Sequence, residues 1–301
     1  MATTQSGILL IDKAEGPSSA QVVHRVKELF QAKKVGHLGT LDPFASGLLL
    51  VGINEGTKIA DIFLGGSKSY RGVMVLGVQT DSQDATGKVV RERSVPLIGE
   101  IELRALEEKF TGELQQVPPM FSALKKNGVR LYRLARQGKE IPREPRSVKV
   151  EALQIKKISD SELEFEVTCS RGTYVRTLAA DMGQTLGCGA HLKSLRRTAC
   201  DHLRIEQSVT IDELERRFAQ GEIPLLSLRT ALSQLRTVRW EGRLISRLRL
   251  GQQELLAQIG RSREAETLVG IVDNRGVLAA LATWTEDISG PRWRLLRVFR
   301  E

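Results

Sequence analysis

The densest group of potentially reactive side chains lies between Gly36 and Leu48, where His37 and Asp42 are accompanied by three glycines and a proline. Glycine permits turns that other residues resist, and Pro43 disfavours a helical conformation at Asp42. Asp42 is therefore expected on a constrained loop, which suits a nucleophilic or basic carboxylate, with His37 close enough to share the site. A plain Asp-Pro turn beside a structural histidine fits the same residues, and spacing alone favours that simpler interpretation.

The segments around this loop predict a mixed α/β (α+β) fold. Continuous or alternating apolar residues indicate strands, and apolar residues repeated every three to four positions indicate helices. Strands are expected over 7–12, 48–53, 70–78 and 163–169. Helices are expected after Ser18 or Ser19, over 178–186 before Gly187, and over 211–219, where Thr210 and Glu213 form a capping box.

A change in composition predicts two domains, over 1–230 and 231–301. All three tryptophans lie in the second, and every basic residue after Lys193 is arginine. That domain has 12 Arg against 8 acidic residues, and the first has 33 basic against 28 acidic residues. Short alternating runs at 267–272, 277–281 and 293–299 indicate a small β-rich unit. This unit is either an appendage that only packs against the first domain or a phosphate-binding unit, because the planar guanidinium of arginine can bind two phosphate oxygens at once. The base composition of the genome explains the arginine bias equally well.

The overall composition narrows the class of protein. With 41% hydrophobic and 27% charged residues, the 301-residue chain is globular. Its net charge of +9 predicts a polyanionic partner, either nucleic acid or an anionic membrane surface. Cys169, Cys188 and Cys200 are odd in number and never two residues apart, so we expect buried thiols in a reduced compartment and no metal. No segment approaches the ~18 apolar residues of a membrane span, and we expect a cytoplasmic protein.

Several motifs in a fixed order give a stronger indication. Residues Gly36 to Leu48 resemble G-H-x-G-x-L-D-P-x-A-x-G-x-L, the catalytic motif of the TruB family of tRNA pseudouridine synthases. The resemblance runs through most of the chain, which makes coincidence implausible. The other segments that carry it are Asp12-Lys13, Gly16 with Ser18-Ser19, Lys68-Ser69-Tyr70, the loop 77–87 with Thr80-Asp81 and Asp84, Gln116 to Lys125, Cys169 to Thr177, Leu186 to Leu192 and Leu195-Arg196-Arg197.

The resemblance implies a fold and a set of site residues. The implied fold is a mixed, largely antiparallel sheet flanked by helices, followed by a small β-rich C-terminal RNA-binding domain of the PUA type. The resemblance implies that Asp42 is the essential aspartate and that Tyr70 stacks on the target uracil. It implies that Tyr174, Arg176 and Leu195 line the uridine pocket. It also implies that His37 contacts the RNA where the base has left its stack, and that Lys13 lies near the active site. The family usually has Lys-Pro-x-Gly near its start; Ala14 replaces that proline here and loosens the turn after Lys13.

The implied reaction agrees with these residue types. Pseudouridine forms when the N1–C1′ bond breaks, the uracil rotates and C5 joins the same sugar carbon, with no redox change, so we expect no cofactor. An ionised carboxylate can attack the sugar, attack the ring or remove a sugar proton, and the sequence leaves all three routes open. Arg176 cannot deprotonate and is expected to keep Asp42 charged, although spacing alone favours a surface arginine at a helix N-terminus.

The two site tyrosines suit a base that is pulled out of its stack. In isolation, a tyrosine that begins a strand belongs more often to a core than to a site. Stacking on an aromatic side chain contributes ~1 to 3 kcal/mol of binding energy per base. This offsets the few kcal/mol that flipping costs, and a closed site then keeps the detached uracil from water.

Residues 125–146 predict an RNA-clamping insertion. They carry eight basic residues around Tyr132 against two glutamates. A solvated charged loop is the simpler interpretation. Because the segment is long and strongly basic, we expect it to be mobile and to add phosphate affinity that depends on salt.

Three functions remain to be distinguished at this point. The resemblance favours isomerisation of uridine 55 in the T-stem-loop of tRNA, by a monomer that requires no protein partner. A non-catalytic RNA-binding protein would use the same basic surface but has no reason to retain Asp42 with Tyr70 and Arg176. A glycoside or nucleoside hydrolase needs two carboxylates, and no second one accompanies Asp42 in a comparable motif.

Overall fold

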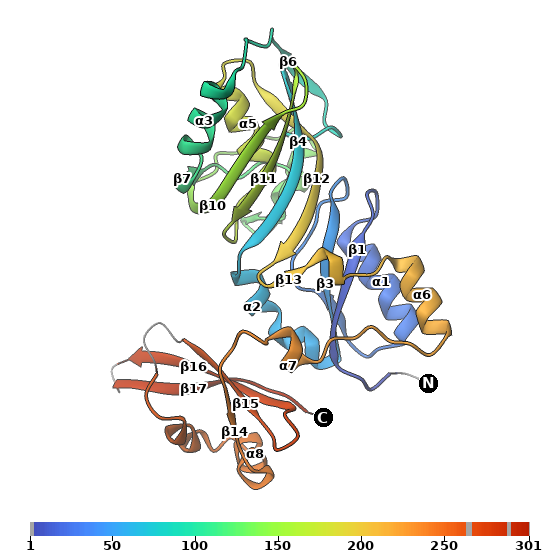
Figure 1. Cartoon of the computed structure of the whole chain (residues 1–301), viewed down its shortest axis with the longest axis vertical. Coiled ribbons are helices and arrows are strands. Elements are labelled where there is room, and N and C mark those ends of the chain that lie inside the picture. Colours follow the sequence, from blue (N-terminus) through green and yellow to red (C-terminus); the bar gives the residue numbers. More distant parts are fainter. Residues whose placement is uncertain (1–2, 263–266, 288–289, 301) are drawn as a thin grey trace.

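The computed structural model describes residues 3–262, 267–287 and 290–300, and these contain two larger sheets and two small two-stranded ones (Figure 1). The larger has nine strands, and its only parallel pair is β12 with β3. Its path runs β7 (Gly112–Gln116), β10 (Arg146–Lys157), β11 (Glu162–Cys169), β4 (Lys68–Leu76), β12 (Ala190–Cys200), β3 (Ser46–Ile53) and β1 (Gly7–Lys13), with β2 (Val35–His37) paired to β3 and β13 (Leu203–Arg204) to β12. The predicted mixed, largely antiparallel sheet is confirmed.

Helices cover this sheet and connect it to the second one (Figure 1). Their bounds are α1 (Ser19–Phe30), α2 (Ala60–Gly65), α3 (Glu100–Lys109), α4 (Leu131–Ala135), α5 (Val175–Thr185), α6 (Ile211–Ala219), α7 (Leu228–Ala231) and α8 (Gly242–Arg249), with 3-10 turns η1 (Asn54–Ile59), η2 (Ile205–Gln207) and η3 (Gln253–Ile259). Two small hairpins pair β5 (Val78–Thr80) with β6 (Val89–Glu92) and β8 (Lys125–Lys126) with β9 (Val129–Arg130).

The second sheet confirms the predicted β-rich C-terminal unit. Its order is β14 (Thr237–Arg239), β15 (Leu268–Val272), β16 (Leu278–Asp287) and β17 (Gly290–Val298). Trp240 and Trp293 are buried in a core of its own. Ser289, Gly290 and Pro291 separate the last two of the predicted alternating runs, and Ser289 lies outside the described residues. The division at residue 230 stays a prediction.

Two details of the sequence prediction are wrong at the level of single residues. The strand expected over 70–78 breaks in two, because Gly77 takes a left-handed backbone with φ +84° between β4 and β5. Thr210 accepts a hydrogen bond from the Glu213 amide at 3.2 Å, but the Glu213 carboxylate binds Arg216 and Arg217 and does not complete the capping box. The helix nevertheless covers the predicted residues.

The buried core and the cysteines follow the sequence pattern. Ser18 caps α1, and Val22, Val26 and Phe30 form its buried face. All three cysteines are free and buried, as expected. Within the described ranges, no helix is both long enough and apolar enough to cross a membrane.

We predict that Gly47→Ala destabilises the protein far more than Gly128→Ala. Both glycines have left-handed backbones, with φ +101° and +80°, so both variants carry the same conformational cost of about 1 kcal/mol. A Cβ at position 47 would also lie 2.3 Å from the Arg197 carbonyl oxygen, whereas nothing lies within 4 Å of one at position 128. Urea unfolding should show an additional loss of at least about 2 kcal/mol for Gly47→Ala. Equal losses would mean that the contact with β12 is unimportant.

Candidate active site around Asp42

Asp42 lies on an irregular loop between β2 and β3 whose carbonyl groups are bound by buried side chains. Arg197, on β12, is 2% exposed. Its guanidinium donates to the carbonyls of Leu48 at 2.7 Å, Gly39 at 3.1 Å and Thr40 at 3.2 Å. A buried carbonyl without a donor is costly, so Arg197 holds both ends of this loop in place.

Lys13 and Ser19 fix the remaining part of the loop. The fully buried Lys13 ammonium donates to the carbonyls of Ala14, Pro17 and Pro43 at 2.7, 2.9 and 3.3 Å. Ser19 Oγ accepts from the Leu41 amide and donates to the Leu41 carbonyl. The turn after Lys13, where Ala14 stands, is therefore tied directly to the residue that follows Asp42.

Burial lowers the pKa of Lys13 to about 8, although the charges of Glu15 and Asp42 act in the opposite direction. Lys13 is thus mainly protonated at neutral pH and adds positive charge near the Asp42 carboxylate. Ala14 and Lys13 also line a cavity of about 560 Å³ between the end of β1, α1 and the start of α6. At its edge Arg196 is ion-paired to Asp12 at 2.6 Å.

Arg176 makes the direct ionic contact with Asp42. Its Nε lies 2.9 Å from Asp42 Oδ2, and its side chain is 5% exposed while that of Asp42 is 42% exposed. Nη1 donates to the Ser82 carbonyl and Nη2 to the Phe121 carbonyl, at 2.8 and 2.7 Å. A buried and fixed guanidinium therefore holds the Asp42 carboxylate where part of it stays exposed to solvent. A surface arginine at a helix N-terminus could not hold the carboxylate in this way.

A second carboxylate lies on the other side of Arg176. Asp84 Oδ2 is 3.6 Å from Arg176 Nη1, and the Asp84 side chain is buried. Asp84 Oδ1 accepts from the Thr86 amide at 3.0 Å, which forms an Asx turn in this loop. Nothing in the residue spacing indicates that this turn faces Arg176.

Tyr174 is positioned through its backbone at the start of α5. Its amide donates to Gln116 Oε1 at 2.7 Å, and Gln116 Nε2 donates to its carbonyl at 3.1 Å. Gln116 is buried at the end of β7. Burial raises the pKa of the Tyr174 hydroxyl, and the Asp42 charge acts in the same direction, which places the tyrosine close to the carboxylate.

The other predicted site residues gather around Arg197. Tyr70 pairs with Arg197 across β4 and β12, and burial raises the pKa of its hydroxyl to about 12. His37 ends β2; burial, and then the charge of Arg197, lower its pKa, and its Nδ1 is buried without a hydrogen-bond partner. Leu195, 6% exposed, belongs to the same apolar cluster as Leu41.

The structure thus brings the predicted residues together to different degrees. Arg176 contacts Asp42 directly, the Asp42 charge raises the pKa of Lys13 and of Tyr174, and Tyr70 and His37 lie beside Arg197. No hydrogen bond between His37 and Asp42 occurs in the described part of the chain. Sequence reasoning missed Asp84, Gln116 and the positioning role of Arg197, although all three fall within the quoted motifs. The described residues contain no cluster of three or more His, Cys, Asp or Glu that could hold a metal, and the absence of a cofactor stays a prediction.

Comparison with known proteins identifies relatives over most of the chain. Residues 27–175 match the family described as TruB family pseudouridylate synthase (N terminal domain), and residues 176–236 match the tRNA pseudouridylate synthase B C-terminal domain. The chain is 48% identical to tRNA pseudouridine synthase B of Geotalea uraniireducens (strain Rf4) over 76% of this chain and 75% of that protein. It is 39% identical to the protein of the same name from Geobacter sulfurreducens, over 97% of this chain and 99% of that one.

Solved structures share the fold. A chain in the crystal structure of a Cbf5-Nop10-Gar1 complex superposes with a TM-score of 0.73 at 25% identity, covering 98% of this chain and 85% of that one. A chain in the structure of an H/ACA RNP bound to a substrate RNA containing 2'-deoxyuridine gives a TM-score of 0.74 at 23% identity. The architecture of both sheets is therefore shared by proteins of distant sequence.

We predict that Lys13 makes stability depend on pH above neutrality. Its pKa is about 8 in the folded chain against 10.5 for a free lysine, so between these values the unfolded chain binds more protons and stability rises with pH. Below about pH 8 the full cost of burying the charge is present. The free energy of unfolding of wild type minus that of Lys13→Met should therefore rise by about 1 to 2 kcal/mol from pH 8 to 9.5. Urea titrations at each pH measure it. Lys34→Met, at an exposed lysine, is the control, and a flat difference for Lys13→Met would contradict the prediction.

Proposed function

Since the chain belongs to the TruB family of pseudouridylate synthases and is therefore an isomerase, we propose that it converts uridine 55 in the T-stem-loop of tRNA to pseudouridine. The relatives named tRNA pseudouridine synthase B support tRNA as the substrate. The basic net charge of +9 suits a polyanion of this kind.

The contact between Arg176 and Asp42 supports this proposal most directly. The carboxylate is partly exposed, while its partner is buried and held by two backbone carbonyls. One Asp42 oxygen is bound by Arg176 Nε, and the exposure of the side chain leaves the other able to reach a bound nucleotide. A plain Asp-Pro turn needs no such buried cation.

The proposed reaction uses base flipping into the space beside Asp42. Tyr70 would stack on the uracil, and Tyr174, Arg176 and Leu195 would line the pocket. Tyr174 is the N-cap residue of α5 and Arg176 is the second residue of the helix. Gln116 holds Tyr174, and the carbonyls of Ser82 and Phe121 hold Arg176. His37, whose pKa burial lowers, would contact the RNA that the base has left.

Asp42 would act on the nucleotide without a cofactor. Breaking N1–C1′ and joining C5 to C1′ releases the C5 proton to solvent while N1 takes up a proton, so the atoms balance and no oxidant or reductant is required. The carboxylate could attack the sugar, attack the ring or remove a sugar proton, and the geometry is compatible with each route. Lys13 and Arg197 hold the Asp42 loop from opposite sides, so the carboxylate is positioned before the substrate binds.

The exposed insertion would clamp the RNA. In it Arg130 and Arg133 lie against the Tyr132 hydroxyl and lower its pKa, and Arg136 lies 5.5 Å from the Tyr132 ring centre. Three guanidinium groups are thus gathered around one aromatic ring. The mobility of the insertion stays a prediction. Three properties of the whole protein also stay predictions: the PUA character of residues 231–301, the monomeric state and the cytoplasmic location.

We predict that Asp42→Asn abolishes turnover. Tritium release from C5-labelled uridine in an unmodified tRNA transcript should be rapid for the wild type and fall at least about 10²-fold for the variant, because the amide lacks the ionised oxygen. The affinity for tRNA should change little. Asp160→Asn, at an aspartate that is 98% exposed, is the matched control and should retain wild-type release. Tight binding with no release by the wild type would favour a non-catalytic RNA-binding protein.

We predict that the triple variant Arg130→Gln, Arg133→Gln and Arg136→Gln weakens tRNA binding in a salt-dependent way. Each lost phosphate contact reduces the slope of log affinity against log salt by about 0.7 to 0.9, so the slope should fall by about 2. Filter binding at several KCl concentrations measures it. Neutralising Lys88, Arg91 and Arg104, which are exposed elsewhere, controls for net charge. Equal slopes for both triple variants would show that the insertion does not clamp RNA.

A further inference from the structure

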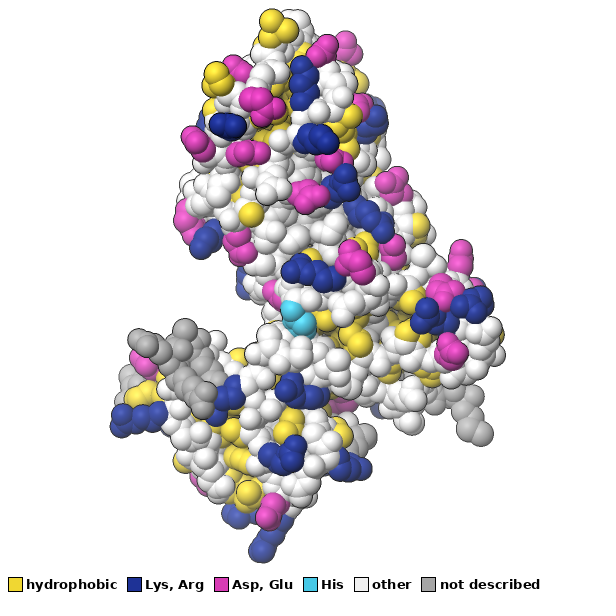
Figure 2. Space-filling model, viewed as in Figure 1, with side chains coloured by type: hydrophobic (Ala, Val, Ile, Leu, Met, Phe, Trp, Pro, Cys, Tyr) yellow, Lys and Arg dark blue, Asp and Glu magenta, His cyan; other side chains and the backbone are white. Residues whose placement is uncertain are grey.

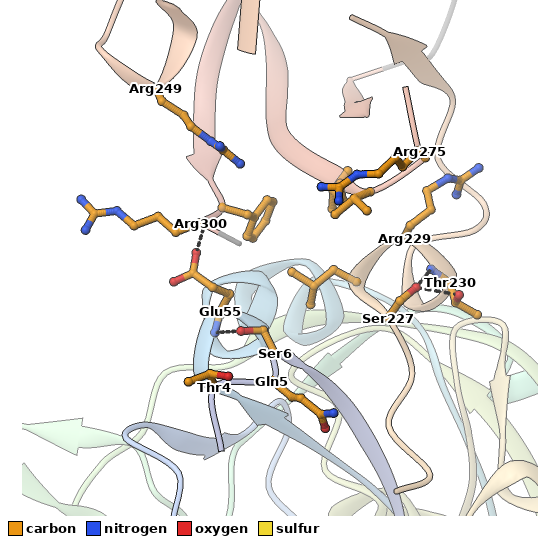
Figure 3. Close-up of a pocket in the computed structure, with 15 residues that line it drawn as sticks. Thr4, Gln5, Ser6, Glu55, Ser227, Arg229, Thr230, Arg249, Arg275 and Arg300 are labelled. Atoms are coloured by element: carbon orange, nitrogen blue, oxygen red, sulfur yellow. Dashed lines mark hydrogen bonds between the residues drawn. The ribbon is translucent and has the colours of Figure 1, made fainter. Parts of the chain in front are cut away.

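The junction cavity, which lies between the two larger sheets, does not include the site around Asp42. Its volume is about 710 Å³, and four arginines stand around it, which are Arg229, Arg249, Arg275 and Arg300 (Figure 3). Figure 2 shows basic side chains over the C-terminal unit, with few acidic ones on that face. None of the described residues that line the cavity is Asp42, Tyr174 or Arg176. These three side chains are therefore held by contacts within the site itself.

The segment 116–122 holds two residues of the proposed uridine pocket. Gln116, which is 4% exposed at the end of β7, forms two hydrogen bonds with the Tyr174 backbone, at 2.7 and 3.1 Å. The Phe121 carbonyl accepts from Arg176 Nη2 at 2.7 Å. These contacts fix the Tyr174 backbone and the Arg176 guanidinium, but they leave the phenol of Tyr174 to be oriented by another group.

Ser122, the next residue along this segment, carries a buried hydroxyl without a partner. The residue is 5% exposed, and its Oγ makes no hydrogen bond to any residue in the described part of the chain. Its backbone is fixed, because its amide donates to the Met120 carbonyl at 2.9 Å and its carbonyl accepts from the Tyr132 amide at 3.1 Å. Burying an unpaired hydroxyl costs free energy that an alanine would not cost. Packing alone therefore does not explain a serine at this position.

The group beside the Ser122 hydroxyl is the phenol of Tyr174. Burial raises the pKa of Tyr174, and the Ser122 hydroxyl is the largest influence in the opposite direction, as expected of a donor next to the phenolic oxygen. The Asp42 charge acts on the same phenol. A hydroxyl rotates about its C–O bond, so Ser122 can donate to the phenolic oxygen, and the Tyr174 proton is then left for a group on its other side.

We propose that Ser122 is a positioning residue that donates to the phenolic oxygen of Tyr174 and so orients the Tyr174 O–H toward the bound uridine. Gln116 fixes the backbone of the tyrosine, and Ser122 fixes its other end. The pocket then offers the nucleotide one donor of defined direction, prepared before the base arrives. The inference rests on the proposed function, since it takes Tyr174 to line the uridine pocket.

The test is a double-mutant cycle between Ser122→Ala and Tyr174→Phe, which removes the phenolic oxygen and keeps the ring. Tritium release from C5-labelled tRNA is measured with enzyme in excess, and affinity by filter binding. Ser122→Ala should slow release about 3- to 10-fold when Tyr174 is present and should have no effect in the Tyr174→Phe background. Affinity for tRNA should change less than about twofold, because phosphate contacts dominate it. Ser94→Ala, at an exposed serine, is the control.

The stability of the variant separates positioning from packing. Because the Ser122 hydroxyl has no partner to lose, the urea midpoint of Ser122→Ala should equal or exceed that of the wild type. Slower release at undiminished stability supports the proposal. Wild-type release by Ser122→Ala would overturn it, and so would the same loss with and without the Tyr174 hydroxyl.

A measurement without substrate distinguishes this inference from the proposed function. Fluorotyrosine labels the three tyrosines of the chain, and Tyr174→Phe identifies the fluorine resonance of Tyr174. Ser122→Ala should shift that resonance and leave the other two in place, while Ser94→Ala should shift none. An unshifted Tyr174 resonance would contradict the role of Ser122, whereas no tritium release by the wild type would contradict the proposed function.

Discussion

A loop that is buried and irregular must have its carbonyl groups hydrogen-bonded by something other than a strand or helix, and this requirement organises the structure around Asp42. Arg197 binds the carbonyls of Gly39, Thr40 and Leu48, while Lys13 binds that of Pro43. Both donors are buried cations that bind backbone oxygens. The sheet serves this arrangement, because β1 and β12 flank β3 and deliver the two cations to opposite sides of one loop.

The same choice of donors has an electrostatic consequence. A neutral donor would satisfy the carbonyls equally well in geometry, but Lys13, Arg197 and Arg176 also place three positive charges near a single partly exposed carboxylate. An anionic nucleotide approaching Asp42 therefore meets a positive environment. Burial opposes this, and lowers the pKa of Lys13 to about 8, whereas arginine keeps its charge throughout the physiological range. Asp84, beyond Arg176, balances part of the excess.

The sequence predicted β1, β3 and β11 and the helices α1, α5 and α6, because apolar periodicity and capping residues act locally, and the dense motif around Asp42 indicated the candidate site residues. It did not predict the partners of those residues. Gln116 holds Tyr174 across 58 positions, and Asp84 faces Arg176 across 92, so both contacts exist only after the sheet has formed. Arg197 belongs to a quoted motif, yet its burial could not be inferred, since an arginine in an alternating strand usually reaches solvent. The break at Gly77 was missed because apolar residues continue on both sides of it.

The choice between lysine and arginine follows from where each charge must act. Lys13 and Lys68 each converge on three nearby carbonyls, which a compact ammonium with three donors can do inside a core. The C-terminal unit contains no lysine at all, and its arginines at the junction cavity are mostly exposed. Arg249, Arg275 and Arg300 of this unit line that cavity together with Arg229 of α7, and the planar guanidinium can make the paired contacts with anionic groups that a compact ammonium cannot.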